Sequence, residues 1–224
     1  MISIIENFLT VYPSAHIGIL AMRNVENLAA HPTLEACKQE LESELRLRFA
    51  DKEPRVLENT HPLPAYTAYY KRFDKTYHVL GQQKSIIYKN KPIPSVASLV
   101  EAMFIAELKN GLLTAGHDLD RVEGNISLNV SNGEEHYVVM RGEDQQLKKG
   151  DLYIADDRGI LSAIIYGPDQ RTQITPETKN ALFTVYAPEG ISDEDVEKHL
   201  LDICDLVQLV TPTAEVGMLE IVGG

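Results

Sequence analysis

The chain has 224 residues, 44% of them hydrophobic, and it carries 33 acidic against 21 basic residues for a formal net charge of −12. This length and apolar content predict one folding unit. The negative charge opposes tight nonspecific binding of DNA or RNA, because such binding mostly neutralises phosphates with cations. The only clusters that hint at a basic patch are Lys71, Arg72 and Lys75, and Lys148 with Lys149.

The start of the chain lacks a basic leader, and no apolar run approaches the length that spans a bilayer. Both cysteines, Cys37 and Cys204, fall on apolar positions of predicted helices, where a thiol behaves as a small hydrophobic group. We therefore expect a cytoplasmic chain with reduced structural thiols and no membrane partner.

Apolar periodicity and breaker residues outline the first part of the chain. A strand or short helix is predicted at residues 2–5, a strand at 16–22, a helix with one apolar stripe from Pro32 onward, a polar connector at 51–61, and helices at 64–73 and 79–88. Aromatic residues recur at helical spacing beside two cations in the segment 66–73. Such a stripe can stack bases, but core packing with the cations extended over it is the favoured interpretation.

The segment from Pro94 to Gly124 is predicted to hold the central helix and the loop that carries the candidate site. Pro94 suits the first helical position, and apolar residues follow at steps of three and four up to Gly111, which suits a left-handed helix end. The polar residues after Gly111 predict a loop held against the end of this helix. We expect the chemistry of the protein in that loop.

Beyond Gly124 the period changes to two, which predicts strands. Ser131-Asn132-Gly133 predicts a tight hairpin turn between strands at 126–130 and 136–140. The remaining elements are strands at 151–155, 160–166, 182–186 and 214–222, and a helix from 192 to about 208 that opens with a Ser192–Asp195 capping box. The predicted fold class is α+β, with a mainly antiparallel or mixed sheet packed against helices.

Several common catalytic motifs are absent. The sequence has no glycine-rich phosphate loop, no G-x-S-x-G motif, no H-E-x-x-H motif and no paired cysteine ligands. No two histidines lie three or four residues apart, which excludes a helical pair of metal ligands. We expect neither a metal nor a cofactor.

His117 and Asp118, with Asp120 close by, form the best candidate for acid–base chemistry. A histidine beside carboxylates can be oriented as a general base near neutral pH. The alternative, which we favour, is structural: one of the carboxylates caps the following turn through backbone amides, and Arg121 pairs with a carboxylate.

A second candidate is the polar loop from Gly167 to Thr172. Arg171 in this loop has the planar fork that binds a carboxylate or a phosphate. A solvated turn explains the same residues equally well.

Three segments in a fixed order resemble a known family. They are HDLDRVEGNISLNV at 117–130, GDLYIADDRGILSAIIYG at 150–167 and ITPETKNALFTV at 174–185. Together they resemble the B-three/B-four (B3/4) domain of the phenylalanyl-tRNA synthetase beta subunit in a free-standing form, and the resemblance extends over residues 94–187. It implies an N-terminal α/β portion at 1–90, an editing-domain-like core at 91–224, and a cleft between the helix-loop segment and the sheet.

In the synthetase, that cleft hydrolyses tyrosine wrongly attached to the phenylalanine tRNA. The resemblance therefore implies ester hydrolysis of a mischarged aminoacyl-tRNA or a related ester, and not aminoacylation, which needs another subunit and an ATP site. By alignment, the implied substrate-binding positions are Phe104, Ala115, Gly167, Arg171 and Thr184.

The chain departs from the family pattern at three of these positions. Phe104 stands where the family has an asparagine, Ala115 stands where it has a histidine, and Thr184 stands near a glutamate that recognises the tyrosine hydroxyl. His117, two residues after Ala115, is a candidate to replace the lost histidine. With these polar residues changed, two further readings stay open: a non-catalytic module that binds an amino acid or an RNA end, and an interaction protein that uses the fold as a scaffold.

Overall fold

The computed structural model describes residues 2–4 and 6–224, so Ile5 of the predicted N-terminal element lies outside the described residues. The first part of the chain contains β1 (Ile2–Ile4), α1 (Glu6–Val11), β2 (His16–Arg23), α2 (Pro32–Phe49), α3 (Pro54–Glu58), α4 (Leu63–Lys71), α5 (His78–Lys89) and α6 (Ser98–Asn110). The second part contains β3 (Leu113–Asp118), the 3-10 turn Leu119–Arg121, β4 (Ile126–Val130), β5 (His136–Val138), β6 (Asp144–Gln146), β7 (Leu152–Ala155), β8 (Ile160–Ala163), β9 (Gly167–Pro168), β10 (Asn180–Ala187), α7 (Asp193–Val210) and β11 (Glu215–Gly223).

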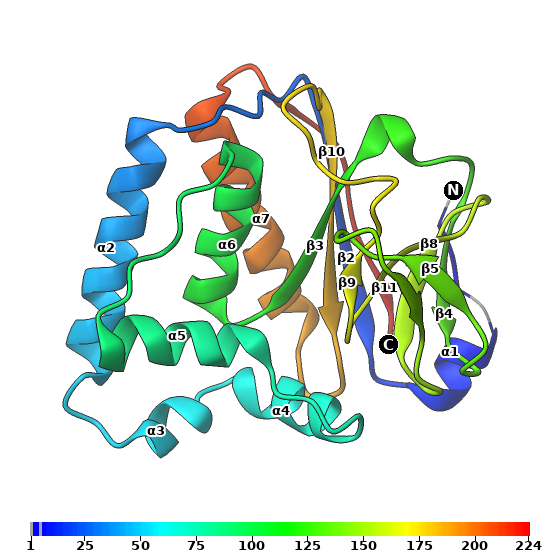
Figure 1. The fold of residues 1–224 in the computed structure, drawn as a ribbon, viewed down its shortest axis with the longest axis horizontal. Coiled ribbons are helices and arrows are strands. Elements are labelled where there is room, and N and C mark those ends of the chain that lie inside the picture. The colour runs from blue at the N-terminus through cyan, green and yellow to red at the C-terminus, as the bar shows by residue number, and fades with distance from the viewer. Residues whose placement is uncertain (1, 5) are drawn as a thin grey trace.

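These elements form three layers, and the fold class is α+β. Helices α6 and α7 cover one face of a four-stranded antiparallel sheet, with α2 packed on their outer side, and a second sheet lies on the other side (Figure 1). The strand order is β11-β2-β10-β3 in the first sheet and β1-β4-β7-β8-β9 in the second, where only β1 pairs in parallel. β5 and β6 form a separate two-stranded ribbon.

Strands β2 and β10 of the central sheet are buried on both faces, which explains their nearly unbroken apolar runs. Every residue of β3 is buried, as are most residues of β2 and β10. Gly18 in β2 lies so close to α7 that a Cβ there would stand 2.3 Å from Cγ1 of Val196. The Tyr66 hydroxyl is inserted at the end of the β3–β10 ladder, where it accepts the Leu113 N–H at 2.9 Å and donates to the Tyr186 carbonyl.

Several predicted elements are confirmed. The helix from Pro32 runs to Phe49, the capping box of Ser192 and Asp195 opens α7, and β7 and β8 pair around 156–159. The aromatic stripe of α4 packs in the core, because its four rings are buried and Tyr69 lies on Phe73 with a centroid distance of 5.2 Å.

Four local predictions are wrong. The connector 51–61 contains the short helix α3, and the central helix begins at Ser98 instead of Pro94, with residue 97 still extended. The first part of the predicted polar loop after Gly111 is the buried strand β3, because its polar side chains find partners far away in the sequence, whereas residues 119–125 form the 3-10 turn and a loop. The predicted hairpin of 126–130 with 136–140 does not form: β4 pairs with β7, and β5 pairs with β6.

The turn at 131–135 explains the failed hairpin. The Glu135 carboxylate accepts the N–H groups of Asn132 and Gly133, while the Ser131 N–H donates to the Asp151 carbonyl at 2.8 Å. These bonds attach the end of β4 to β7 and lead the chain away from β4.

The loop before α6 is fixed by a buried ion pair. Lys38 Nζ lies 2.8 Å from Glu101 Oε1, and both side chains are almost fully buried. The same carboxylate oxygen accepts the Val96 N–H at 2.9 Å, and the Asn27 side chain accepts the Leu99 N–H at the start of the helix. Residues distant in sequence therefore cap α6 where a proline start was predicted.

Among the described residues, no helix has both the length and the apolar content needed to cross a bilayer. Within the same residues, no group of three or more His, Cys, Asp or Glu side chains is arranged to hold a metal ion.

Candidate functional site

His117 lies inside the protein between the two sheets, with none of its surface exposed. Its Nδ1 is 2.8 Å from Thr172 Oγ1, and its Nε2 is 3.3 Å from Ser162 Oγ. The Thr172 hydroxyl in turn donates to Asp169, which assigns the histidine proton to Nδ1. Burial and then the charge of Arg171 lower the pKa of His117 to about 3, so the ring is neutral.

Asp118 caps the turn that follows β3. Its Oδ1 accepts the Asp120 N–H at 3.1 Å, and its Oδ2 accepts the Thr178 hydroxyl at 2.8 Å. The Arg121 guanidinium lies 3.7 Å from Oδ2. These are the contacts that the structural interpretation of this segment predicts.

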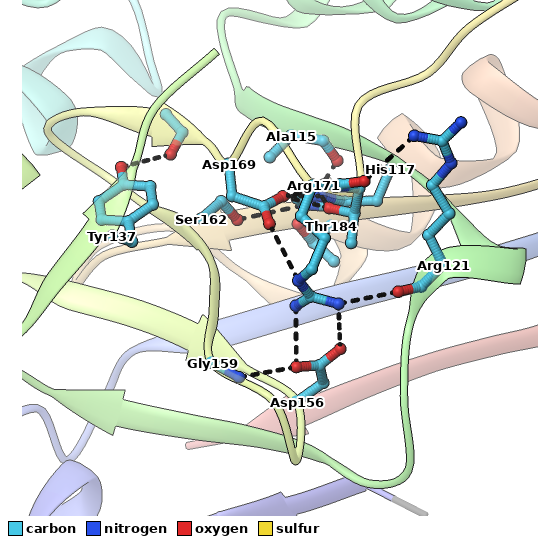
Figure 2. Close-up of polar contacts among 12 residues, drawn as sticks. Ala115, His117, Arg121, Tyr137, Asp156, Gly159, Ser162, Asp169, Arg171 and Thr184 are labelled. Carbon is cyan, nitrogen blue, oxygen red and sulfur yellow. Dashed lines mark hydrogen bonds and ion pairs between the residues drawn. The ribbon is translucent and has the colours of Figure 1, made fainter. Parts of the chain in front are cut away.

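Arg171 is bound to carboxylates of its own chain, as Figure 2 shows. Two of its nitrogens donate to the Asp156 carboxylate at 2.9 and 3.0 Å, and Nε lies 3.5 Å from Asp169. One of the same nitrogens also donates to the Arg121 carbonyl at 2.8 Å. Hydrogen bonds from the guanidinium and from three backbone amides hold the pKa of Asp156 below its ordinary range against the effect of burial.

A cavity of about 370 Å³ lies along the free edge of β3. One wall is α6, with Met103, Phe104 and Glu107, and the opposite wall is the segment 163–168. The lining is mostly apolar, as is usual for sites that bind small molecules. A cavity is thus present between the central helix and the sheet, where the family resemblance implies a cleft.

Two tyrosine hydroxyls hold the wall formed by 163–168. Tyr70 donates to the Ile164 carbonyl at 2.8 Å, and Tyr137 donates to the Gly167 carbonyl at 2.7 Å, the latter bond visible in Figure 2. Gly167 has a φ of 79°, which favours glycine at this turn.

The candidate residues from the sequence fall into two groups. Phe104, Ala115 and Gly167 line the cavity. His117, Asp118, Arg171 and Thr184 are not among its lining residues; Thr184 is fully buried, and its hydroxyl donates to the Ala115 carbonyl at 3.4 Å. The sites predicted around His117 and Arg171 form one hydrogen-bonded network, but that network lies outside the cavity.

Glu107 is the only carboxylate in the lining of the cavity among the described residues. Its Oε1 accepts the Thr114 N–H at 2.7 Å, the only hydrogen bond of this carboxyl group within the described part of the chain. Burial raises the pKa of Glu107 from its ordinary 4.5 to about 8, and the Thr114 bond opposes that shift. The group therefore exchanges a proton close to neutral pH.

The backbone of Gly116 faces the cavity. The N–H groups of Thr114 and Asp118, two residues to either side, point away from β10, toward Glu107 and the Thr172 carbonyl. The two-residue period of a strand turns the Gly116 N–H the same way, and no described residue accepts a hydrogen bond from it. A Cβ here would stand 2.9 Å from Cδ1 of Ile174, so a larger residue would require the end of the Ile174 side chain to shift.

Glu107 and Gly116 are absent from the candidates that the sequence yields. One signal for Glu107 exists: it lies four residues after Met103 and three after Phe104, so a charged residue falls on the apolar stripe of the helix. Gly116 carries no such signal, because its role follows from the position of β3 at the sheet edge.

The family model described as B3/4 domain matches residues 66–200, which is more than half of the chain. The phenylalanine–tRNA ligase beta subunit of Fusobacterium nucleatum is 43% identical over 77 residues, which are 33% of this chain and 10% of that protein. The beta subunit of Mycoplasma genitalium is 32% identical over 69 residues, 31% of this chain and 9% of that protein.

Among solved structures, an N-terminal fragment of the phenylalanyl-tRNA synthetase beta subunit from Pyrococcus horikoshii aligns with the whole chain and with 54% of the fragment, at 10% identity and a TM-score of 0.48. The matched segments span about a tenth of the length of the two beta subunits compared above. By its family model, which covers the helix, the free strand edge and the opposite wall of the cavity, the chain belongs to the B3/4 domain family.

Proposed function

We propose that the cavity binds the aminoacyl group of an aminoacyl-tRNA, or of a related aminoacyl ester, and hydrolyses the ester. The observation that carries the proposal is the convergence of one buried carboxyl group, Glu107, and one unpaired backbone donor, Gly116, on the same cavity. The likeness to proteins named phenylalanine–tRNA ligase beta subunit supports an aminoacyl ligand.

The chemistry assigned to these groups is general-base hydrolysis. Glu107, when ionised, accepts a proton from a water molecule whose oxygen attacks the ester carbonyl carbon. The negative charge that develops on the carbonyl oxygen is stabilised by a hydrogen bond from the Gly116 N–H. The intermediate then collapses, the ester C–O bond breaks, and the leaving alkoxide takes the proton.

The pKa of Glu107 sets the expected pH dependence. With a pKa of about 8, about a tenth of the carboxyl groups are ionised at pH 7. The rate of hydrolysis should therefore rise with pH and level off above pH 8. Phe104, Ala115 and Gly167 are proposed to form the walls that hold the amino-acid side chain.

The catalytic roles predicted for His117 and Asp118, and the binding roles predicted for Arg171 and Thr184, stay predictions. Their contacts favour an indirect role, in which they fix the position of β3 and of the loop 167–172. A substitution of His117 would then disturb the fold without removing a reacting group.

The test is deacylation of a panel of mischarged tRNAs by the wild-type protein and the Glu107→Gln variant. Glutamine retains an oxygen that accepts the Thr114 N–H but cannot act as a base. We expect the variant to release the amino acid roughly 10²- to 10⁴-fold more slowly. No release above buffer by the wild-type protein across the panel contradicts the proposal.

A second candidate function is ligand binding without turnover, and the mostly apolar lining around a carboxyl group that is largely protonated at pH 7 favours it. This function predicts a higher melting temperature with amino acids or their adenosine esters, and no product. A melting temperature that stays constant across these ligands excludes it.

A further inference from the structure

A second hollow beside the cavity is lined by lysines. This groove has a volume of about 350 Å³ and lies between the end of α4, the following loop and α5. We call it the lysine groove and define it by Lys71, Lys75, Thr76, His78, Gly81 and Lys84.

The lysine groove and the cavity adjoin each other. His78, an exposed residue, lines both hollows. Lys75 Nζ lies 5.8 Å from the centroid of the Tyr166 ring, and Tyr166 belongs to the lining of the cavity. A ligand that occupies the cavity and extends past Tyr166 therefore reaches the lysines.

The charge of this groove contrasts with that of the whole chain, which has a net charge of −12. Lys84 is paired with Glu58 at 2.6 Å. Lys71 and Lys75 are exposed, and neither makes an ion pair with a carboxylate in the described part of the chain. Asp74 precedes Lys75 but is not among the residues that line the groove. Two cations beside the cavity are thus free to bind an anion.

We propose that the lysine groove binds backbone phosphates of an RNA strand whose aminoacylated end occupies the cavity. This inference rests on the proposed function and adds the surface that holds the RNA. Lysines without partners suit phosphates, since each contact releases a condensed cation from the RNA. The ring of His78, which packs edge-on against Tyr77, and the half-buried ring of Tyr166 lie between the groove and the cavity, where their remaining surface can stack on a base.

The first test measures binding of a short fluorescein-labelled single-stranded RNA by fluorescence anisotropy at several salt concentrations. Lys71→Gln/Lys75→Gln should weaken binding about tenfold at low salt and reduce the slope of log K against log salt by about 1.4, or about 0.7 for each lost contact. Lys179→Gln/Lys198→Gln is the matched control, because it removes the same charge from exposed lysines outside the groove. Equal affinity and slope for both double variants, or no RNA binding by the wild-type protein, overturn the proposal.

The second test separates the groove from the chemistry. Hydrolysis of an amino-acid ethyl ester, which has no phosphate, should be the same in the wild-type protein and in Lys71→Gln/Lys75→Gln, whereas deacylation of mischarged tRNA should slow in the variant. If both activities fall equally, the groove acts through the fold and the proposal is wrong. Salt-dependent RNA binding through the groove without any hydrolysis would remove the proposed function and leave the groove as the RNA-binding surface.

Discussion

Replacing Glu107 with glutamine should change how the stability of the protein depends on pH, independently of any catalytic role. The carboxyl group is fully buried, and burial raises its pKa to about 8. In the unfolded chain the same group has an ordinary pKa near 4.5. Between these two values the folded chain holds a proton that the unfolded chain releases, so rising pH favours unfolding.

The size of the effect follows from the shift. A change from 4.5 to about 8 corresponds to about 5 kcal/mol of stability that is fully present below pH 4.5 and lost as pH rises through 8. This figure is an upper limit, because the effective dielectric around a carboxyl group that lines a cavity is higher than that of a dry interior. The substituted glutamine side chain is neutral at every pH and keeps the hydrogen bond from the Thr114 N–H. The stability of the variant should therefore not fall as pH rises through 8.

The assay is urea denaturation of the wild-type protein and Glu107→Gln at pH 5, 7 and 9. We expect similar free energies of unfolding at pH 5 and a variant that is more stable by several kcal/mol at pH 9. Asp151, whose pKa burial raises to about 7, affects both proteins equally and cancels in the difference. Glu143→Gln, at an exposed carboxylate, is the matched control. A difference between Glu107→Gln and wild type that is the same at all three pH values refutes the reasoning.

Three further substitutions test how the parts around the cavity are held. Tyr66→Phe removes the hydroxyl between β3 and β10 and should lower the free energy of unfolding in urea by about 1–3 kcal/mol. An unchanged free energy of unfolding would contradict a stabilising role for this hydroxyl. Gly18→Ala should lower the melting temperature, whereas Gly81→Ala should not, because a Cβ at position 81 would meet open space. Equal effects of the two substitutions on the melting temperature would argue against close packing of Gly18 on α7. Lys38→Met should lower the free energy of unfolding by about 3–5 kcal/mol, because it leaves the buried Glu101 carboxylate without its cation, and adding Glu101→Gln should restore most of that loss. An unchanged stability of Lys38→Met would show that the ion pair is dispensable.

Elements whose signals are local could be predicted from the sequence. The stripe of α2 and the capping box of α7 each depend on residues within a few positions of one another, and both are found as predicted. The pairing of β4 could not be predicted, because the partner of the strand is decided by contacts of Ser131 with Asp151 across the turn. The Asn-Gly signal identified a turn but not the strands that flank it.

The candidate site shows the same limit. The family resemblance located the region of the cavity and three of its lining positions, Phe104, Ala115 and Gly167. His117 was a candidate base because it lies beside two carboxylates in the sequence, yet it is buried in a strand and bonds to Thr172, 55 positions later. Glu107 is not among the candidates from the sequence, because its burial and its bond to the Thr114 N–H depend on the position of β3 beside α6.

The hydroxyls of Tyr70 and Tyr137 bond to backbone carbonyls of one wall, while Lys38 and Asn27 anchor the opposite helix. None of these bonds passes through the side chains of Phe104 or Ala115. The distance between the walls of the cavity and the chemical character of its lining therefore depend on different residues. Under the proposed function, exchanges at those two positions would change the selectivity for the ligand while the width of the opening stays fixed.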